Sequence, residues 1–265
     1  MMGPIFDTHA HYGSRQFDPD RDALLDGLPG RGVAGIIDCG TDLDTSERCR
    51  ALAHSRPWIW AAAGIHPESL IEEDSSTTVR FGGDWRAELA ALRPLFEDER
   101  VVAVGEIGLD HHWPVPRDEQ LALFEAQIHL ALELDKPVIV HDRQAHEPTY
   151  ALLRRYRPRG VLHCYSGSAE DALALAEQGF YFGFGGAVTF KGAKRAVKAV
   201  QALPADRILL ETDCPYMAPE PLRGQRCDSG MIAHTAAFIA EVRGVSPEEL
   251  LIQTDANARQ LFRLP

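Results

Sequence analysis

The feature that most constrains the fold of this chain is a regular alternation of short apolar runs with segments of helical periodicity. Eight runs rich in β-branched or aromatic residues occur at 5–6, 33–37, 59–63, 101–104, 138–140, 161–162, 181–184 and 208–210. The clearest helical segment between them covers 117–135, where apolar residues recur with the period of a helix. Continuous apolar strands separated by helices predict a parallel sheet that is buried on both faces.

Eight strand-helix units in 265 residues favour a closed (β/α)8 TIM barrel, formed by a single domain over residues 1–265. An open doubly wound sheet is the alternative, but no Gly-x-Gly-x-x-Gly turn follows an early strand. We predict helix N-caps at Ser168 and at Ser246, which is followed by proline and two glutamates. The polar stretch 67–84 is expected to be a solvated loop. The stretch 215–230 follows the last strand and is expected at the active face of the barrel.

Charge and cysteine content narrow the classes of function. The formal net charge of −12 argues against a broad nucleic-acid-binding surface, although it is compatible with a local cationic rim. The five cysteines are far apart and form no Cys-x-x-Cys pair, which is typical of a reduced intracellular protein. The apolar stretch 58–65 is far shorter than the roughly 20 residues that span a bilayer. We therefore expect a cytoplasmic protein with no membrane association, of undetermined oligomeric state.

Polar residues that can bind metal follow five of the predicted strands. They are His9 and His11 after the first, Glu106 after the fourth, His141 after the fifth, His163 after the sixth and Asp213 after the eighth. The carboxyl ends of the strands of a parallel barrel converge on one rim, so residues distant in sequence meet there. Two histidines separated by one residue on a strand also project to the same side. This pattern predicts a metal site at the rim.

Four histidines and two carboxylates are more ligands than one tetrahedral ion needs. Two divalent ions roughly 3.5–4 Å apart, bridged by Glu106 and a hydroxide, would use all six. Asp213 would then be a ligand or the base that takes a proton from the bridging water. We therefore predict that Glu106 and Asp213 are catalytic. Imidazole and carboxylate ligands suit Zn, Mn, Mg or Co and do not choose among these metals.

Five further residues are candidates for supporting roles. His66, Arg143 and Lys191 follow the third, fifth and seventh predicted strands and are candidates for binding a substrate phosphate. Asp110 and Glu211 are expected to accept hydrogen bonds from the ligating histidines and to fix their orientation. A histidine that orients a loop, or a carboxylate in a structural ion pair, is the alternative for His66, Asp110 and Glu211.

Six segments resemble, in order, the motifs of TatD-like metal-dependent hydrolases, which are barrels related to the amidohydrolases. They read Phe-Asp-Thr-His-Ala-His at 6–11, Gly-Ile-His-Pro at 64–67, Val-Gly-Glu-Ile-Gly-Leu-Asp at 104–110, Val-Ile-Val-His at 138–141, His-Cys-Tyr-Ser-Gly-Ser at 163–168 and Leu-Glu-Thr-Asp-Cys-Pro-Tyr at 210–216. The resemblance covers nearly the whole chain and implies a divalent-metal site built from the six ligand candidates above. Characterised members of this family are phosphoesterases on DNA, commonly 3′–5′ exonucleases, and some are described as D-aminoacyl-tRNA deacylases.

The chain departs from the family pattern at 223–229, which reads Arg-Gly-Gln-Arg-Cys-Asp-Ser where such proteins usually have Arg-Gly-Lys-Arg-Asn-Glu-Pro. The leading hypothesis is a deoxyribonuclease or phosphodiesterase of the 3′–5′ exonuclease type, acting on nucleic-acid ends through a metal-bridging hydroxide. Because of the altered loop, the alternatives are an ester or amide hydrolase such as a D-aminoacyl-tRNA deacylase, or a small-molecule phosphoesterase. A metal-dependent binding protein without catalysis is a third hypothesis.

Overall fold

The computed structural model describes residues 3–265, which fall into two compact units. The first unit comprises the chain up to Ile37 together with His163–Pro265, and the second comprises Asp38–Leu162. Within residues 3–265, eight strands form one sheet in the order β1 to β8. They are β1 (Ile5–Ala10), β2 (Val33–Cys39), β3 (Ile59–Ala63), β4 (Val101–Asp110), β5 (Val138–Arg143), β6 (Gly160–Leu162), β7 (Tyr181–Phe184) and β8 (Ile208–Leu210).

The strand order confirms the predicted fold class. Each of the eight predicted runs lies within one of these strands. β1 also makes a parallel bridge to the chain after β8, between Ala10 and Cys214, so the order of strands closes on itself. Eight parallel strands that alternate with helices and close in this order form a (β/α)8 barrel. The extent of the domain, predicted as one unit over residues 1–265, stays a prediction.

Strands β1, β4 and β5 are longer than predicted, and this changes where five site residues lie. The pairing of β4 with β5 continues through Gly108 with His141 and Asp110 with Arg143. The prediction that certain site residues follow their strands is therefore wrong for four of them, which lie inside the strands: His9, Glu106, His141 and Arg143. Apolar runs alone underestimate such strands because backbone hydrogen bonding does not depend on the polarity of the side chain.

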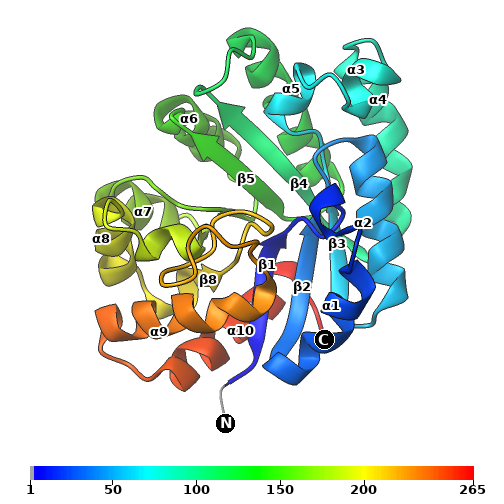
Figure 1. The fold of residues 1–265 in the computed structure, drawn as a ribbon. Helices are drawn as coiled ribbons and strands as arrows, with labels where there is room; N and C mark the ends of the chain where they lie inside the picture. The colour runs from blue at the N-terminus through cyan, green and yellow to red at the C-terminus, as the bar shows by residue number, and fades with distance from the viewer. Residues whose placement is uncertain (1–2) are drawn as a thin grey trace. The chain divides into compact units, whose positions relative to one another are not determined.

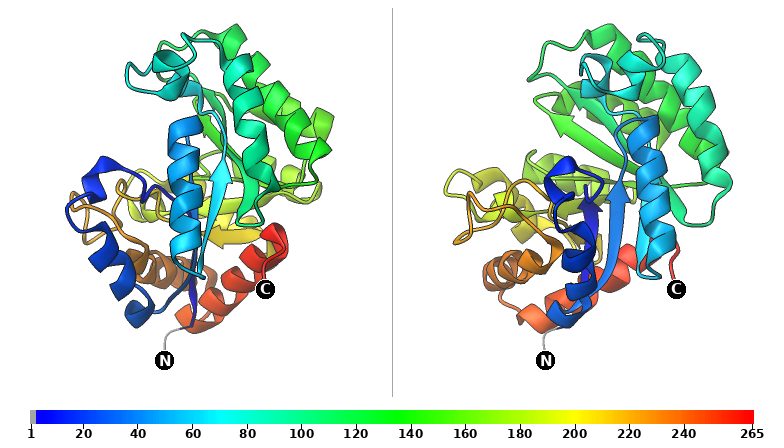
Figure 2. Two further views of the ribbon diagram at one scale, coloured as in Figure 1. Left: turned by 90° about the vertical axis from the view of Figure 1, so that its right-hand side faces the viewer. Right: turned by 45° about the vertical axis from the view of Figure 1, so that its right-hand side comes forward.

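Helices cover the strands in both units (Figures 1 and 2). The first unit contains α1 (Arg21–Gly27), α7 (Ala169–Ala176), α8 (Lys194–Ala202), α9 (Ile232–Arg243) and α10 (Pro247–Phe262), with 3₁₀ turns η1 (Arg15–Phe17), η2 (Pro29–Arg31), η5 (Gly186–Thr189), η6 (Ala205–Arg207) and η7 (Ser229–Met231). The second contains α2 (Leu43–Ser55), α3 (Ser76–Val79), α4 (Trp85–Leu92), α5 (Arg117–Glu133) and α6 (His146–Tyr156), with η3 (Pro67–Leu70) and η4 (Arg93–Glu97). In the first unit α10 packs on β1 and β8, and in the second α2 packs on β3 and α5 on β4.

The structure confirms both predicted helix caps and corrects one predicted loop. The Ser168 hydroxyl accepts a hydrogen bond from the backbone N–H of Asp171, and Ser246 forms a reciprocal capping box with Glu249. The stretch 67–84 is not a purely solvated loop, because it contains η3 and α3 and buries Ser76 and its neighbours. Hydrogen bonding explains the burial of these polar residues, since the backbone N–H of Ser76 donates to the Asp42 carboxylate at 2.7 Å. No helix within residues 3–265 has the length and hydropathy needed to cross a membrane.

Candidate metal centre

The first unit brings two histidines and a carboxylate together at one end of β1. His9 lies within β1, His11 follows it, and Asp213 lies three residues after the last residue of β8. The backbone N–H of Asp213 donates to the carbonyl oxygen of His9 at 2.9 Å, and that of His11 donates to the carbonyl oxygen of Cys214 at 2.9 Å. Backbone pairing between β1 and the chain after β8 therefore fixes the relative positions of the three side chains.

The three donor atoms of this cluster have the spacing of ligands to one ion. His9 Nε2 and His11 Nε2 are 3.0 Å apart, and Asp213 Oδ1 lies 3.2 Å from His11 Nε2 and 3.7 Å from His9 Nε2. Bonds of about 2.1 Å to a tetrahedral divalent ion place neighbouring ligand atoms about 3.4 Å apart. Burial alone would raise the pKa of Asp213, but its hydrogen bond to His11 and the nearby His9 and His163 hold that pKa below its usual range. The donor set therefore fits a divalent cation. We refer to His9, His11 and Asp213 as the first cluster.

His163 and Glu211 lie beside the first cluster. The imidazole ring of His163, which directly follows β6, stacks on that of His9 with ring centres 4.0 Å apart. The buried carboxylate of Glu211 accepts a hydrogen bond from the backbone N–H of Cys164 at 2.5 Å and lies 3.7 Å from His163 Nδ1. Glu211 thus joins the segment after β8 to the segment that carries His163.

Asp7 supports the first cluster from within β1 and was not among the residues predicted from the sequence. Its carboxylate is fully buried and accepts hydrogen bonds from the backbone N–H groups of His9 and Thr212 and from the hydroxyls of Thr212 and Ser229. Burial is the main cause that raises the pKa of Asp7 to about 7. The sequence feature that could have identified Asp7 is a carboxylate inside an apolar strand. A buried carboxylate needs hydrogen-bond partners, so it indicates a residue that holds neighbouring segments in place.

The second unit brings a second group of ligand-type side chains together. His66 Nε2 and His141 Nδ1 lie 3.5 Å and 3.0 Å from the same oxygen, Oε1 of Glu106. His66, Glu68 and His141 also form a group whose ligand atoms all lie within 4.8 Å of one another. These donor types suit a divalent metal. We refer to His66, Glu68, Glu106 and His141 as the second cluster.

Asp110 and Gln120 fix the position of the His141 ring in the second cluster. His141 Nε2 lies 2.9 Å from Asp110 Oδ2, so this carboxylate orients the ring and leaves Nδ1 directed at Glu106. The amide of Gln120, which is buried on α5, accepts from the backbone N–H of Asp110 and donates to its carbonyl oxygen. Burial opposes ionisation of Asp110, but its contact with His141 and two backbone N–H groups hold its pKa below the usual range.

Glu68 is a member of the second cluster that was missed in the sequence. It lies in η3, two residues after His66, and its backbone N–H donates to His66 Nδ1 at 3.2 Å. Burial, together with repulsion from Asp110, raises the pKa of Glu68 to about 7. The stretch that contains Glu68 was predicted to be a solvated loop, and a glutamate in such a loop does not indicate a functional site. The proline after His66 could have indicated the helical turn η3, because proline favours the first position of a helical turn.

The remaining predicted substrate-binding residues lie on the surface. Arg143 is exposed at the end of β5, with its guanidinium 6.0 Å from the centre of the Trp113 ring. Lys191 is exposed between η5 and α8 and lines a pocket of the first unit. Neither side chain forms an ion pair with another residue in the described part of the chain. His66, in contrast, is buried within the second cluster.

Ion pairs and a hydrogen bond connect the altered loop at 223–229 to other residues of the first unit. The Arg226 guanidinium donates to both carboxylate oxygens of Asp20, at 2.8 and 2.6 Å. Asp228 pairs with Arg31 at 2.8 Å, and the backbone N–H of Ser229 donates to the hydroxyl of Tyr12 at 2.9 Å. Of the four residues that differ from the usual pattern, Asp228 and Ser229 therefore have defined partners in the first unit.

Comparison with known proteins agrees with the motifs. The family model of TatD related DNase matches residues 6–263. The chain is 37% identical over 264 residues to an uncharacterized metal-dependent hydrolase, YabD, of Bacillus subtilis, covering 98% of this chain and 99% of the relative. It is 36% identical over 272 residues to the 3′-5′ ssDNA/RNA exonuclease TatD of Erwinia billingiae, covering 98% and 100% of the two chains. The crystal structure of YjjV, a TatD homolog from Escherichia coli, superposes with a TM-score of 0.89 at 31% identity over 100% of both chains. The chain thus belongs to the TatD-related DNase family.

Proposed function

We propose that this protein is a divalent-metal-dependent hydrolase that removes nucleotides from the 3′ end of single-stranded nucleic acids. The observation that carries the proposal is the first cluster, in which two imidazole nitrogens and a carboxylate oxygen lie 3.0, 3.2 and 3.7 Å apart. The names of relatives support the reaction class, since one is called a metal-dependent hydrolase and another a 3′-5′ ssDNA/RNA exonuclease.

We further propose that two divalent ions, of Zn, Mn, Mg or Co, are held by the six ligands predicted from the sequence, which are His9, His11, Glu106, His141, His163 and Asp213. The fold supports this grouping, because the carboxyl ends of the strands of a parallel barrel share one rim. Such ions, when bound, lower the pKa of water towards neutrality and offset the charge that develops on phosphoryl oxygens. Glu106 is proposed as the shared ligand.

The protein side chains have distinct proposed tasks. Asp213 remains ionised because its pKa is held low, so it can ligate a cation or accept a proton from an attacking water. Asp110 and Glu211 are proposed as positioning residues for His141 and His163 respectively. Arg143 and Lys191 are proposed to contact substrate phosphates. His66, although it lies in the second cluster, is also proposed to contact a substrate phosphate rather than to ligate an ion. A cytoplasmic location stays a prediction of the sequence.

The proposal is tested with a single-stranded DNA 20-mer that carries a label on its 5′ end. Metal-loaded protein is expected to shorten the strand stepwise, and a terminal 3′-phosphorothioate linkage is expected to delay the first cut. Asp213→Asn is expected to remove this activity, whereas Asp206→Asn, at an exposed carboxylate, is expected to retain it. Equal rates for wild type and Asp213→Asn would contradict the proposal.

The altered loop motivates a parallel substrate panel. RNA, a D-aminoacyl-tRNA and a simple phosphoester are assayed beside the labelled DNA at the same metal concentration. Faster hydrolysis of the carboxyl ester would favour the deacylase alternative, and hydrolysis of the simple phosphoester alone would favour a small-molecule phosphoesterase. Binding of substrate without any turnover would favour a binding protein.

A further inference from the structure

We infer that a pocket of the first unit holds the nucleotides that precede the cut end of a single strand. The inference rests on the proposed function and adds a strand-binding subsite to it. The pocket has a volume of about 660 Å³. Sites for small ligands occupy roughly 300–1,000 Å³, so a nucleotide unit fits this space. We refer to it as the strand pocket.

The strand pocket begins next to a proposed metal ligand. Cys164, which follows His163, lines it, and the backbone N–H of Cys164 donates to the Glu211 carboxylate at 2.5 Å. Residues from η5 and from the start of α8 form another part of its wall, and Arg223 of the altered loop completes it. A nucleic-acid strand bound in the pocket would thus have one end beside His163.

The charge of the strand pocket suits a phosphate backbone. Four cationic side chains line it, namely Lys191, Lys194, Arg195 and Arg223, and all are exposed. Within residues 3–265 none of the four forms an ion pair, and no Asp or Glu of that range lines the pocket. This local surplus of positive charge occurs in a chain with a net charge of −12. Cations without acidic partners attract phosphates and release counterions on binding.

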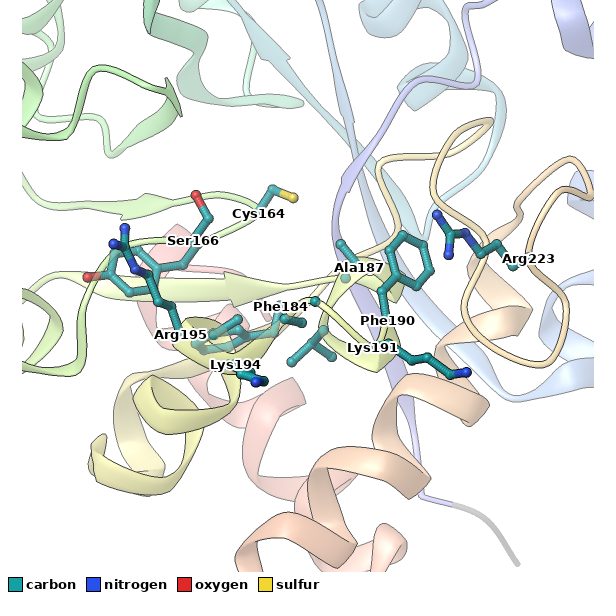
Figure 3. Close-up of a pocket in the computed structure, with 15 residues that line it drawn as sticks. Cys164, Ser166, Phe184, Ala187, Phe190, Lys191, Lys194, Arg195 and Arg223 are labelled. Carbon is teal, nitrogen blue, oxygen red and sulfur yellow. The ribbon is translucent and has the colours of Figure 1, made fainter.

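An aromatic side chain indicates that the occupant also has a flat apolar part. Phe190 is partly exposed and lines the pocket, and the Arg223 guanidinium lies 4.3 Å from the centre of its ring. Phe184 also lines the pocket, but it is buried. Figure 3 shows Arg195 on the side of Ser166 and Arg223 on the side of Phe190, so that cations flank the aromatic part. Cations combined with an aromatic stacking surface are typical of single-strand binding, in which unpaired bases stack on aromatic rings. The bases of a duplex are already stacked on one another.

Binding is tested without cleavage, by the fluorescence anisotropy of a labelled dT12 in EDTA. Arg195→Ala is expected to raise Kd severalfold and to reduce the slope of log Kd against log salt by about 0.7, the value for one lost phosphate contact on a single strand. Phe190→Ala is expected to raise Kd about tenfold with an unchanged slope, because stacking does not involve counterions. Lys198→Ala is the matched control, since Lys198 is an exposed cation of α8 that does not line the pocket.

Three results would overturn the inference. The first is wild-type affinity for labelled dT12 in both pocket variants, and the second is an effect of Lys198→Ala as large as that of Arg195→Ala. The third is complete displacement of labelled dT12 by dTMP at the same concentration, counted in nucleotides, at which unlabelled dT12 displaces it. The last result would assign the pocket to free mononucleotides. Failure of the proposed function is separate, because it would appear as absent hydrolysis in the presence of metal while the binding results in EDTA still stand.

Discussion

The two ligand clusters differ in the pKa of a carboxyl group, whereas the donor atoms of both are closely spaced. In the first cluster, the three donor atoms lie within 3.7 Å of one another, and the pKa of Asp213 is held below its usual range. In the second, His66 Nε2 and His141 Nδ1 lie 3.5 Å and 3.0 Å from Glu106 Oε1, but burial raises the pKa of Glu68 to about 7. A carboxyl group must lose its proton before it can bind a cation. The first cluster is therefore expected to hold its ion more tightly.

The supports of the two clusters also differ. Strand pairing and the buried Asp7 carboxylate fix the backbone of the first cluster. The second depends on side chains of α5, because Gln120 holds Asp110 and Gln127 donates to and accepts from the backbone of Ile65, next to His66. Changes in these supports are expected to affect one cluster more than the other.

The largest effect is expected from removal of metal. Complete chelation should reduce hydrolysis of the labelled strand to background, because the water then lacks activation. During stepwise depletion the second cluster should empty first, so activity should decline before the last ion leaves. Activity and metal content measured on the same samples check this, and hydrolysis at full rate by metal-free protein would contradict it.

The next largest effect is expected from His11→Ala. This variant lacks one of the three closely spaced donors, so kcat/KM on the labelled strand should fall by about 10³-fold. His234→Ala, at an exposed histidine of α9, is the matched control and should retain wild-type kinetics. A fall of less than tenfold in His11→Ala at saturating metal would show that the first cluster is not the main site.

Asp110→Asn should have a smaller effect, confined to the second cluster. Loss of the carboxylate that orients His141 should weaken metal affinity by 10- to 100-fold, the usual range for such outer partners. Titration with metal should restore much of the activity, unlike in His11→Ala. Asp118→Asn, at an exposed carboxylate of α5, controls for the change of charge. A defect that excess metal does not relieve would contradict a positioning role.

The smallest expected effect is on stability. Gln127→Ala leaves the buried N–H and carbonyl of Ile65 without their side-chain partner, which should lower the free energy of unfolding by about 2 kcal/mol. Urea unfolding compares it with Gln201→Ala, at an exposed position of α8. Equal midpoints for the two variants would show that the amide of Gln127 does not support the second cluster.

The first cluster was easier to predict from the sequence than the second. Alternation on a strand places His9 and His11 on the same side without knowledge of any other residue. Asp213 follows a clear apolar run. The apolar runs ended too early in both clusters, since His9, Glu106 and His141 all lie inside their strands. In the second cluster, however, Glu106 and His141 lie on different strands, so no spacing along the chain brings them together. Glu68 lies in a stretch with no periodicity to place it.

The residues that support the two clusters could not be predicted from the sequence either, because their roles depend on partners in other segments. On α5 the apolar periodicity does not mark Gln120 and Gln127 as buried, yet both are, whereas Leu121 and Leu132 are partly exposed. These amides are buried because they bind backbone groups of other segments, and a pattern of hydrophobic residues along one helix carries no information about such partners. Asp7 is a similar case in β1.

The most direct test of the account is the number of ions bound per chain. Native mass spectrometry of protein loaded with Mn²⁺ should show two ions in the wild type, one in His11→Ala, one in His141→Ala and none in the double variant. A wild type that binds at most one ion would contradict the two-ion site, as would single variants that both retain the wild-type number of ions.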